Sequence, residues 1–525
     1  MSQRPLGAQL SHMLKDRGVT HIFGIPGVHN QEMYRGIEEA GLIHILARHE
    51  QGAGFMADGY ARATGKPGVC YVITGPGLCN IMTPLGQAYS DSVPVLCISS
   101  CLDETAATRG QLHQMKDQEA AAATVCDWSD TAQSAQAAYT LVDRALAELR
   151  HDRPRPKSVI VPIAQLEAQA QAAPPRAPSE HPVIRSANIS PLKDMLANAS
   201  KPLFIFGGGV RDAAWVNVLL QATKAASFTT YAGRGLVDTA APLHFGSMLA
   251  RPSSAKVLAE ADLVIGIGTE LSEGDLWRDA LGHDCPLVRV DIDPEVLSDQ
   301  HRAEIAFHYD GDAFLEDLHS LDIGREVSDW DAGMVEKTRA QWRAEINSER
   351  PGILPVADAL RDALPPKTMI YSDMTQFAYA AKEIWDMDAP GHWHHPTGFG
   401  TLGYALPASI GGAIARPGKP TLCIIGDYGF QYTMAELATA VELKLPLPII
   451  LWDNGKLGEI EDSMTRAQIA PNAVIQQNPD FIKLAEAFGA RAAKPATLAG
   501  LATEVRDAFE AEGPTLIHLT PEIAP

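Results

Sequence analysis

The chain has 525 residues, of which 46% are hydrophobic and 20% are charged, a composition typical of a globular protein with several domains. Its formal net charge of −21 argues against nucleic acid and anionic membranes as partners, because both repel an acidic surface. No signal-peptide-like stretch opens the chain and no apolar run is long enough to span a membrane, so we expect a cytoplasmic protein.

The first α/β block extends to residue 165, and apolar strand-like runs alternate in it with helical segments. The expected strands are 21–25, 69–74, 93–99 and 158–163, and the clearest helix is 50–63. A stretch rich in Ala and Pro, 166–186, follows this block. We interpret it as a linker on the surface.

The second block, 187–335, and the third block, 352–525, repeat this alternation. The expected strands are 202–209, 261–270 and 286–294 in the second block, and 368–373, 421–427, 447–454 and 513–520 in the third. Continuous apolar strands are typical of parallel sheets that helices cover on both faces. The sequence therefore predicts an α/β fold of three domains, each a mostly parallel sheet flanked by helices.

The seven cysteines do not form a pattern that binds zinc or builds a disulfide framework. Their number is odd, no two are spaced as Cys-x-x-Cys, and most lie in apolar runs. We interpret them as small buried hydrophobic residues.

Two polar turns in the third block, 426–429 and 453–456, follow consecutive expected strands. Asp427 and Asn454 are 454 − 427 = 27 positions apart, which leaves room for one helix and a second, parallel strand. Both turns would then lie at the carboxyl edge of one sheet, where open α/β sheets bind ligands. A carboxylate, an amide oxygen and a free carbonyl suit Mg²⁺ that holds a diphosphate.

This segment resembles the cofactor-binding motif of thiamine-diphosphate enzymes, which extends from Gly-Asp-Gly to Asn-Asn. The resemblance implies that Asp427 and Asn454 are side-chain ligands of Mg²⁺ and that Lys456 supplies its main-chain carbonyl. The implied cofactor-binding positions in this segment are Gly426, Asp427, Tyr428, Gly429 and Asn454. Tyr428 replaces the central Gly of the motif and Asp453 its first Asn, and neither change removes an implied ligand. Taken alone, the pattern also fits an ordinary strand–helix–strand unit with an acidic cap.

A second motif, RHEQGAGFMADGYAR at 48–62, is nearly identical to the pattern RHEQxAxxMAxGYAR of the same family. From the residues alone, Glu50 is a carboxylate at a helix start, where the helix dipole favours negative charge. The resemblance implies that Glu50 hydrogen-bonds the aminopyrimidine of the cofactor and promotes its imino tautomer. That tautomer takes the C2 proton of the thiazolium ring, which gives the ylid. The resemblance also implies that this Glu comes from the partner subunit, so that the site lies at the interface of a homodimer or homotetramer.

Further motifs of the family supply the remaining implied contacts. The turn 74–77 provides Gly75, and Asn80 follows it, both beside the pyrimidine ring. In the glycine-rich segment 398–408, Leu402 would be the wedge that bends the cofactor, and the Gly400 carbonyl would accept from its amino group.

The turn after the strand 368–373 matches the place where the family binds the diphosphate. It contains Asp373, Thr375 and Gln376, and Thr375 stands where the family commonly has Gly.

The central domain binds FAD in the acetohydroxyacid synthases of this family, and ADP or nothing in other relatives. Gly207–Gly209 follows a strand but is not a full GxGxxG fingerprint. FAD is therefore an alternative cofactor that the sequence does not favour.

The loop 109–114 aligns with the synthase segment that carries Phe-Gln, with His113 at the Phe position and Gln114 at the Gln position. A His there can protonate an enamine, which favours simple decarboxylation to an aldehyde. The other interpretation of His113 is an ordinary residue of a surface loop.

The acidic residues Glu459, Glu461 and Asp462 fall on a helix that covers the substrate in the family, where they could receive a guanidinium group. A solvated acidic face is the alternative. Four segments are also similar to those of 5-guanidino-2-oxopentanoate decarboxylases, namely RGQLHQMKDQ, IPGVHN, RHEQGAGFMADGYAR and IIGDYGFQYT. We therefore expect decarboxylation of a 2-oxo acid with a cationic side chain. The alternatives are an acetolactate-synthase-like carboligase, which condenses the decarboxylated acid with a second acceptor, and a non-catalytic protein of this fold.

Overall fold

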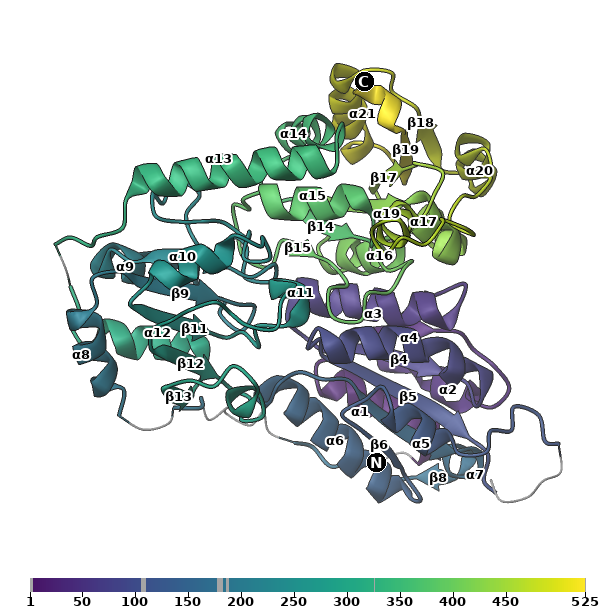
Figure 1. Cartoon of the computed structure of the whole chain (residues 1–525). Coiled ribbons are helices and arrows are strands. Elements are labelled where there is room, and N and C mark those ends of the chain that lie inside the picture. The colour runs from purple at the N-terminus through teal and green to yellow at the C-terminus, as the bar shows by residue number, and fades with distance from the viewer. Residues whose placement is uncertain (1–2, 105–109, 177–182, 186–187, 325, 525) are drawn as a thin grey trace.

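The computed structural model describes residues 3–104, 110–176, 183–185, 188–324 and 326–524. Three sheets of six, five and six strands each form the centre of one α/β domain, and every strand pairing within them is parallel (Figure 1). The predicted fold class is therefore confirmed. No helix among the described residues is long and apolar enough to cross a membrane.

The sheet of the first domain has the strand order β3-β2-β4-β5-β7-β6. Its strands are β2 (His21–Gly24), β3 (Ile43–Leu46), β4 (Gly68–Val72), β5 (Val95–Cys101), β6 (Trp128–Thr131) and β7 (Lys157–Pro162). Its helices are α1 (Leu6–Asp16), α2 (Gln31–Ala40), α3 (Glu50–Thr64), α4 (Pro76–Ser90), α5 (Gln118–Ala123), α6 (Ala135–His151) and α7 (Ile163–Glu167). The start of the expected linker still pairs with this domain, because β8 (Gln169–Ala170) is antiparallel to β1 (Arg4–Pro5). Residues 177–182 and 186–187 lie outside the described residues.

The central domain has the strand order β10-β9-β11-β12-β13. Its strands are β9 (Pro202–Phe206), β10 (Ala226–Thr229), β11 (Leu263–Ile267), β12 (Leu287–Asp291) and β13 (Ile305–His308). Its helices are α8 (Ser190–Asn198), α9 (Ala213–Thr223), α10 (Ser254–Glu260), α11 (Glu273–Leu276) and α12 (Gly311–His319), and α13 (Ala332–Glu349) leads to the third domain.

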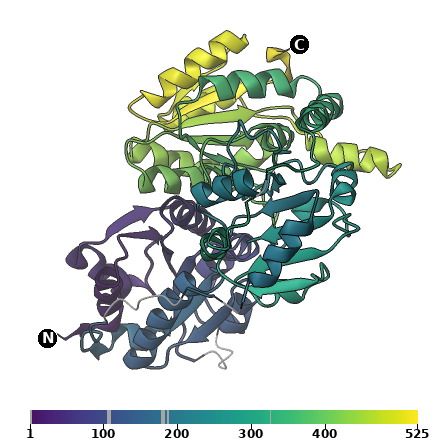
Figure 2. The same cartoon turned by 90° about the vertical axis from the view of Figure 1, so that its left-hand side faces the viewer.

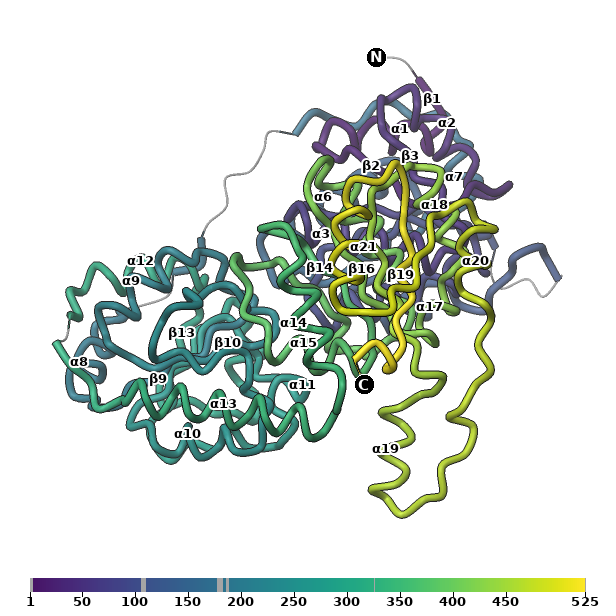
Figure 3. The backbone as a smooth tube through the Cα atoms, turned by 90° about the horizontal axis from the view of Figure 1, so that it is seen from above, coloured from purple at the N-terminus to yellow at the C-terminus, as the bar shows by residue number. Residues whose placement is uncertain are grey.

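The third domain has the strand order β15-β14-β16-β17-β19-β18. Its strands are β14 (Met369–Ser372), β15 (Trp393–His394), β16 (Thr421–Gly426), β17 (Pro448–Trp452), β18 (Arg491–Ala493) and β19 (Thr515–Leu519). Its helices are α14 (Ile353–Ala363), α15 (Gln376–Ile384), α16 (Ala405–Ala415), α17 (Asp427–Thr433), α18 (Leu437–Glu442), α19 (Gly458–Arg466), α20 (Phe481–Phe488) and α21 (Leu498–Phe509). Figure 3 shows α19 and the segment after it projecting away from the rest of the chain.

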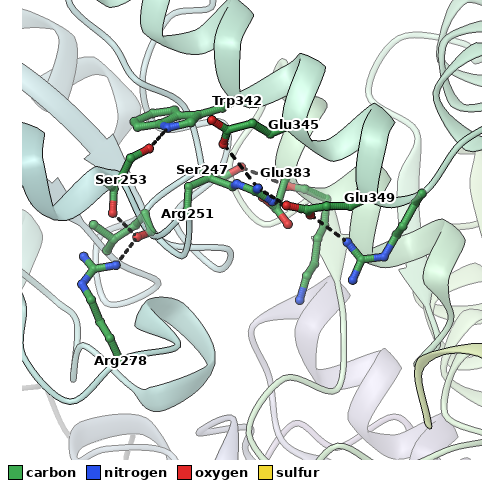
Figure 4. Close-up of polar contacts among 12 residues, drawn as sticks. Ser247, Arg251, Ser253, Arg278, Trp342, Glu345, Glu349 and Glu383 are labelled. Carbon is green, nitrogen blue, oxygen red and sulfur yellow. Dashed lines mark hydrogen bonds and ion pairs between the residues drawn. The ribbon is translucent and has the colours of Figure 1, made fainter. Parts of the chain in front are cut away.

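A buried arginine ties the central domain to the third domain. The Arg251 guanidinium donates to Glu349 of α13 at 2.9 Å, and it contacts Glu345 of α13 and Glu383 of α15 at 3.5 Å each (Figure 4). Because a buried cation is costly unless it is paired, this network holds α13 against both domains.

The first and third domains pack through α3 and α16, while the central domain lies beside both (Figure 2). A Cβ on Gly59 would lie 1.9 Å from the Ala408 carbonyl oxygen, and one on Gly411 would lie 1.9 Å from the Met56 carbonyl oxygen. Glycine at both positions therefore lets the two backbones touch. Since residue 408 faces residue 59 and residue 411 faces residue 56, the two helices are antiparallel.

Candidate active site

The two polar turns of the third domain are neighbours at the carboxyl edge of its sheet. The parallel pairing of β16 with β17 places Gly426 opposite Trp452, so that Asp427 and Asp453 follow at the same level of the sheet. The Gly455 backbone N–H then donates to Asp427 Oδ2 at 3.1 Å. The spacing in the sequence thus corresponds to a βαβ unit with adjacent polar ends.

Asp427 is 3% exposed, and its carboxylate accepts from two further side chains that follow α19. Asn478 Nδ2 donates to Asp427 Oδ2 at 2.7 Å, and Gln476 Nε2 donates to the same oxygen at 3.1 Å. Burial raises the pKa of the Asp427 carboxyl, and these two bonds act in the opposite direction. Sequence reasoning missed both amides, because no local pattern marks residues that reach back 49 and 51 positions.

The oxygen atoms beside Asp427 fit a hard divalent cation. Asn454 is held over the same edge, where its Nδ2 donates to Gln376 Oε1 at 3.4 Å and its Oδ1 accepts from Lys456 N at 3.3 Å. Within the described part of the chain, the Lys456 carbonyl accepts no hydrogen bond. A carboxylate, an amide oxygen and a carbonyl without a donor are the oxygen ligands that Mg²⁺ prefers.

Three helices, α15, α17 and α19, begin near this edge, and none has a side-chain hydrogen bond at its N-cap. Their N-cap residues are Thr375, Gly426 and Leu457. Free N–H groups and the positive end of the helix dipole favour phosphate. The residues present therefore fit a cation together with a diphosphate.

Asp373 fixes the glycine-rich loop rather than facing this edge. Its buried carboxylate accepts from the backbone N–H of Met374 at 2.8 Å, Gly403 at 2.9 Å and Ala405 at 3.3 Å. Burial raises the pKa of Asp373 to about 7. The loop leaves Gly400 exposed and Leu402 half-buried. Leu402, the Asp427 turn and Gln376 make up what we call the third-domain cluster.

A second group of candidate residues gathers at the carboxyl ends of β4 and β5. Glu50, the first residue of α3, is buried, and its Oε2 accepts from Asn80 Nδ2 at 2.9 Å. The turn at Gly75 lies against the loop that contains His113, because a Cβ on Gly75 would lie 2.3 Å from the His113 carbonyl oxygen. Glu50, Gly75, Asn80 and His113 make up the first-domain cluster.

His113 and Gln114 differ in their surroundings. Gln114 Oε1 accepts from Gln111 N of its own loop at 3.2 Å. His113 Nδ1 lies 3.3 Å from His29 Nδ1, in the loop after β2. Sequence reasoning gave His29 no role. Arg109 of the His113 loop lies outside the described residues.

The two clusters lie at opposite ends of the α3–α16 pair within one chain. Tyr404, just before α16, donates to Asp58 at 2.9 Å, and the Arg62 guanidinium lies 5.7 Å from the centre of its ring. Leu402 therefore lies near the C-terminal end of α3, whereas Glu50 starts this helix. Glu50 and Arg62 are 62 − 50 = 12 residues apart, about 18 Å along the axis. A single chain does not bring Glu50 to Leu402.

The acidic residues of α19 are unequally paired. Glu459 contacts Arg350 at 3.0 Å and Arg466 at 3.5 Å, and Glu461 contacts Lys456 at 2.5 Å. Asp462 instead accepts from a neutral amide, Gln376 Nε2, at 2.9 Å. Of the three acids that the sequence singled out, Asp462 is therefore the one whose charge has no cation beside it in these contacts.

Glu436, between α17 and α18, holds the start of α3 from the third domain. This residue is 1% exposed, and its carboxylate accepts from Arg48 N at 2.9 Å and His49 N at 3.0 Å. A Cβ on Gly52 would lie 2.0 Å from Glu436 Oε1, so the contact also requires this glycine.

Replacing Glu436 should destabilise the chain, because it leaves the backbone N–H groups of Arg48 and His49 without their acceptor. We expect Glu436→Ala to lower the free energy of unfolding by about 2 kcal/mol, and Glu436→Gln by less, since Gln keeps an acceptor oxygen. Denaturant unfolding measures both, and the exposed Glu512→Ala is the control. An Ala variant as stable as the wild type would contradict this role for Glu436.

Three family models match the chain in order. The thiamine pyrophosphate enzyme N-terminal TPP binding domain matches residues 4–121, the central domain 189–318 and the C-terminal TPP binding domain 373–519. The chain is 42% identical to the probable 2-ketoarginine decarboxylase AruI of Pseudomonas aeruginosa, over 98% of this chain and 93% of that protein. It is 29% identical to the acetolactate synthase isozyme 2 large subunit of Escherichia coli, over 98% and 95% of the two chains. It is 30% identical to the acetolactate synthase large subunit IlvB1 of Mycobacterium tuberculosis, over 93% of this chain and 83% of that protein.

Proposed function

The chain belongs to the thiamine pyrophosphate enzyme family, and from this premise we propose that it catalyses the Mg²⁺-dependent, non-oxidative decarboxylation of a 2-oxo acid in the cytoplasm. Thiamine diphosphate, when bound, supplies the electron sink for cleavage of the bond to the carboxylate. The observation that carries decarboxylation over carboligation is His113, an imidazole in the first-domain cluster, because an imidazolium can donate the proton that completes an aldehyde. FAD has no part in this proposal.

The chain's own residues divide the work between the two clusters. Asp427, Asn454 and the Lys456 carbonyl would hold the cation, and the starts of α15 and α17 would hold the diphosphate. Glu50, buried and hydrogen-bonded to Asn80, would exchange a proton with the aminopyrimidine. Leu402, on its fixed loop, would support the bent form of the cofactor.

A second copy of the chain would complete the site, so we propose a homodimer or homotetramer. Glu50 and Leu402 lie at opposite ends of the α3–α16 pair, so the Glu50 that serves one Leu402 comes from another chain. Large apolar side chains on the loops of both clusters and on α19 are also exposed, which favours a covering partner. They are Val28 at 61%, Leu112 at 63%, Phe399 at 49% and Ile460 at 48%.

Mixing two inactive variants should restore activity if sites span two chains. Chains with Glu50→Gln and chains with Asp427→Ala each lack one half of every site, but a mixed dimer contains one site with both halves intact. After joint refolding we expect up to about one quarter of the wild-type rate, because half the dimers are mixed and each has one working site. A mixture as inactive as its two components would place both halves in one chain.

The substrate we propose carries a cationic side chain, such as the guanidinium of 5-guanidino-2-oxopentanoate. Asp462 on α19 keeps a carboxylate near the cation site, where it accepts from the neutral Gln376 amide. The similar Pseudomonas protein is named a probable 2-ketoarginine decarboxylase. A guanidinium placed against Asp462 would form a charge-assisted pair.

A panel of 2-oxo acids tests this function. The purified protein with thiamine diphosphate and Mg²⁺ is offered pyruvate, benzoylformate, branched-chain acids and 5-guanidino-2-oxopentanoate, and both CO₂ and organic product are measured. We expect fastest turnover of the guanidino acid, to an aldehyde. Acetolactate from pyruvate would support the carboligase, in line with the similarity to acetolactate synthases. No turnover of any acid would support the non-catalytic alternative.

A further inference from the structure

Two histidines from different loops meet in the first-domain cluster. His29 follows β2 and His113 follows β5, yet their Nδ1 atoms lie 3.3 Å apart. The two rings meet edge to face, with centroids 4.8 Å apart and planes at 74°. Within the described part of the chain, neither imidazole makes another hydrogen bond.

The backbone of His113 has an unfavourable conformation at this contact. Its φ of 63° is left-handed, which costs a side chain such as His about 1 kcal/mol or more. The His113 carbonyl is packed under Gly75, and a Cβ on Gly77, two residues later, would lie 3.5 Å from Glu50 Oε1. The histidine pair and Glu50 therefore flank the same turn. Strained residues of this kind concentrate at functional sites.

The Nδ1–Nδ1 contact holds one proton at a time, because one nitrogen must donate and the other accept. Two protonated rings would place two donors and two positive charges against each other. Burial, and after it the charge of His113, lowers the pKa of His29, while Asp103 acts in the opposite direction. Glu50, on α3, is the charged group across the turn. The lowered pKa of His29 favours its neutral form, whose Nδ1 can accept a hydrogen bond.

We propose that neutral His29 accepts a hydrogen bond from His113 Nδ1–H, and that His113 thereby carries the proton that replaces the substrate's carboxylate. This inference rests on the proposed function. The bond to the carboxylate breaks, CO₂ leaves, and the electron pair stays on the former carbonyl carbon. A new C–H bond forms there with the Nε2 proton of His113, which becomes neutral and is reprotonated from water. His29 is a positioning residue, since it acts through His113.

Substitution of His29 should slow protonation without slowing cleavage. We expect His113→Phe to lower the rate of aldehyde formation about 10²-fold. His29→Phe, which keeps a ring but no acceptor, should lower it about tenfold, as expected for one hydrogen bond to a charged group. In His29→Phe, the loss of activity that occurs at high pH should also begin at a lower pH, because the imidazolium of His113 loses its acceptor. His29→Asn, whose Oδ1 can accept, should restore rate and profile. His319→Asn, an exposed His at the end of α12, is the control.

An electron-accepting dye separates the two steps. With 2,6-dichlorophenolindophenol present, the carbon left by decarboxylation is oxidised before it is protonated, so CO₂ release by His29→Phe should return to near the wild-type rate. If His29→Phe loses CO₂ release equally with and without dye, or leaves the pH profile unchanged, His29 has only a structural role. If the wild type releases no CO₂ from any 2-oxo acid, the proposed function fails first.

Discussion

Glu50→Gln is expected to lower the rate of CO₂ release about 10³-fold while leaving cofactor affinity nearly unchanged. Glu50 is buried at the start of α3 and accepts from Asn80 at 2.9 Å, and Gln keeps the size and one acceptor oxygen. What Gln cannot do is exchange a proton, and positioned acid–base groups typically contribute 10²–10⁴-fold. Steady-state CO₂ release and calorimetric binding of thiamine diphosphate measure the two effects separately.

The exposed residue Glu486, substituted in the same way, controls for loss of one charge. A Glu50→Gln variant that turned over at the wild-type rate would remove Glu50 from the proton exchange. One that lost cofactor binding and activity together would assign it a structural role instead.

Asp427→Ala is expected to abolish the stabilisation of the protein by thiamine diphosphate and Mg²⁺. A ligand at one hundred times its Kd stabilises the folded state by about 2.7 kcal/mol, and this increment should appear in the wild type and vanish in the variant. The reason is that Asp427 is the one charged member of the proposed cation site, beside Asn454 and the Lys456 carbonyl.

Denaturant unfolding with and without both ligands measures this difference, and each ligand added alone is the control. Asp427→Asn keeps the hydrogen-bonding oxygen without the charge, so it should recover only part of the increment. Wild-type stabilisation of Asp427→Ala by the ligand pair would place the cation elsewhere.

The strands that sequence reasoning recognised are those with a neighbour on both sides. β4, β9, β16 and β17 are buried at every residue and appear in the sequence as unbroken apolar runs. In the three large sheets, the strands it did not recognise are the edges, namely β3, β6, β10, β13, β15 and β18. β13 alternates between exposed and buried residues, and β15 has two residues. An edge strand has fewer neighbours and so a weaker apolar pattern.

The residues of the candidate site likewise fall into those that a local sequence motif marks and those that it does not. Residues that follow a strand within one motif, such as Asp427, could be placed from the sequence, because the carboxyl ends of parallel strands share one edge. Asn478 reaches Asp427 from 51 positions away, and Glu436 reaches the start of α3 from 388 positions away. Neither contact leaves a pattern in the sequence. The pairing of His29 with His113 likewise depends on how two loops fold over one turn.

The ratio of CO₂ released to 2-oxo acid consumed tests the central claim most directly. Purified protein with thiamine diphosphate and Mg²⁺ is given 5-guanidino-2-oxopentanoate as the only substrate, and both quantities are followed to completion. We predict one CO₂ for each acid consumed, with the aldehyde as the product. One CO₂ for every two acids consumed would mean that a second acid captures the first, and the chain would then be a carboligase.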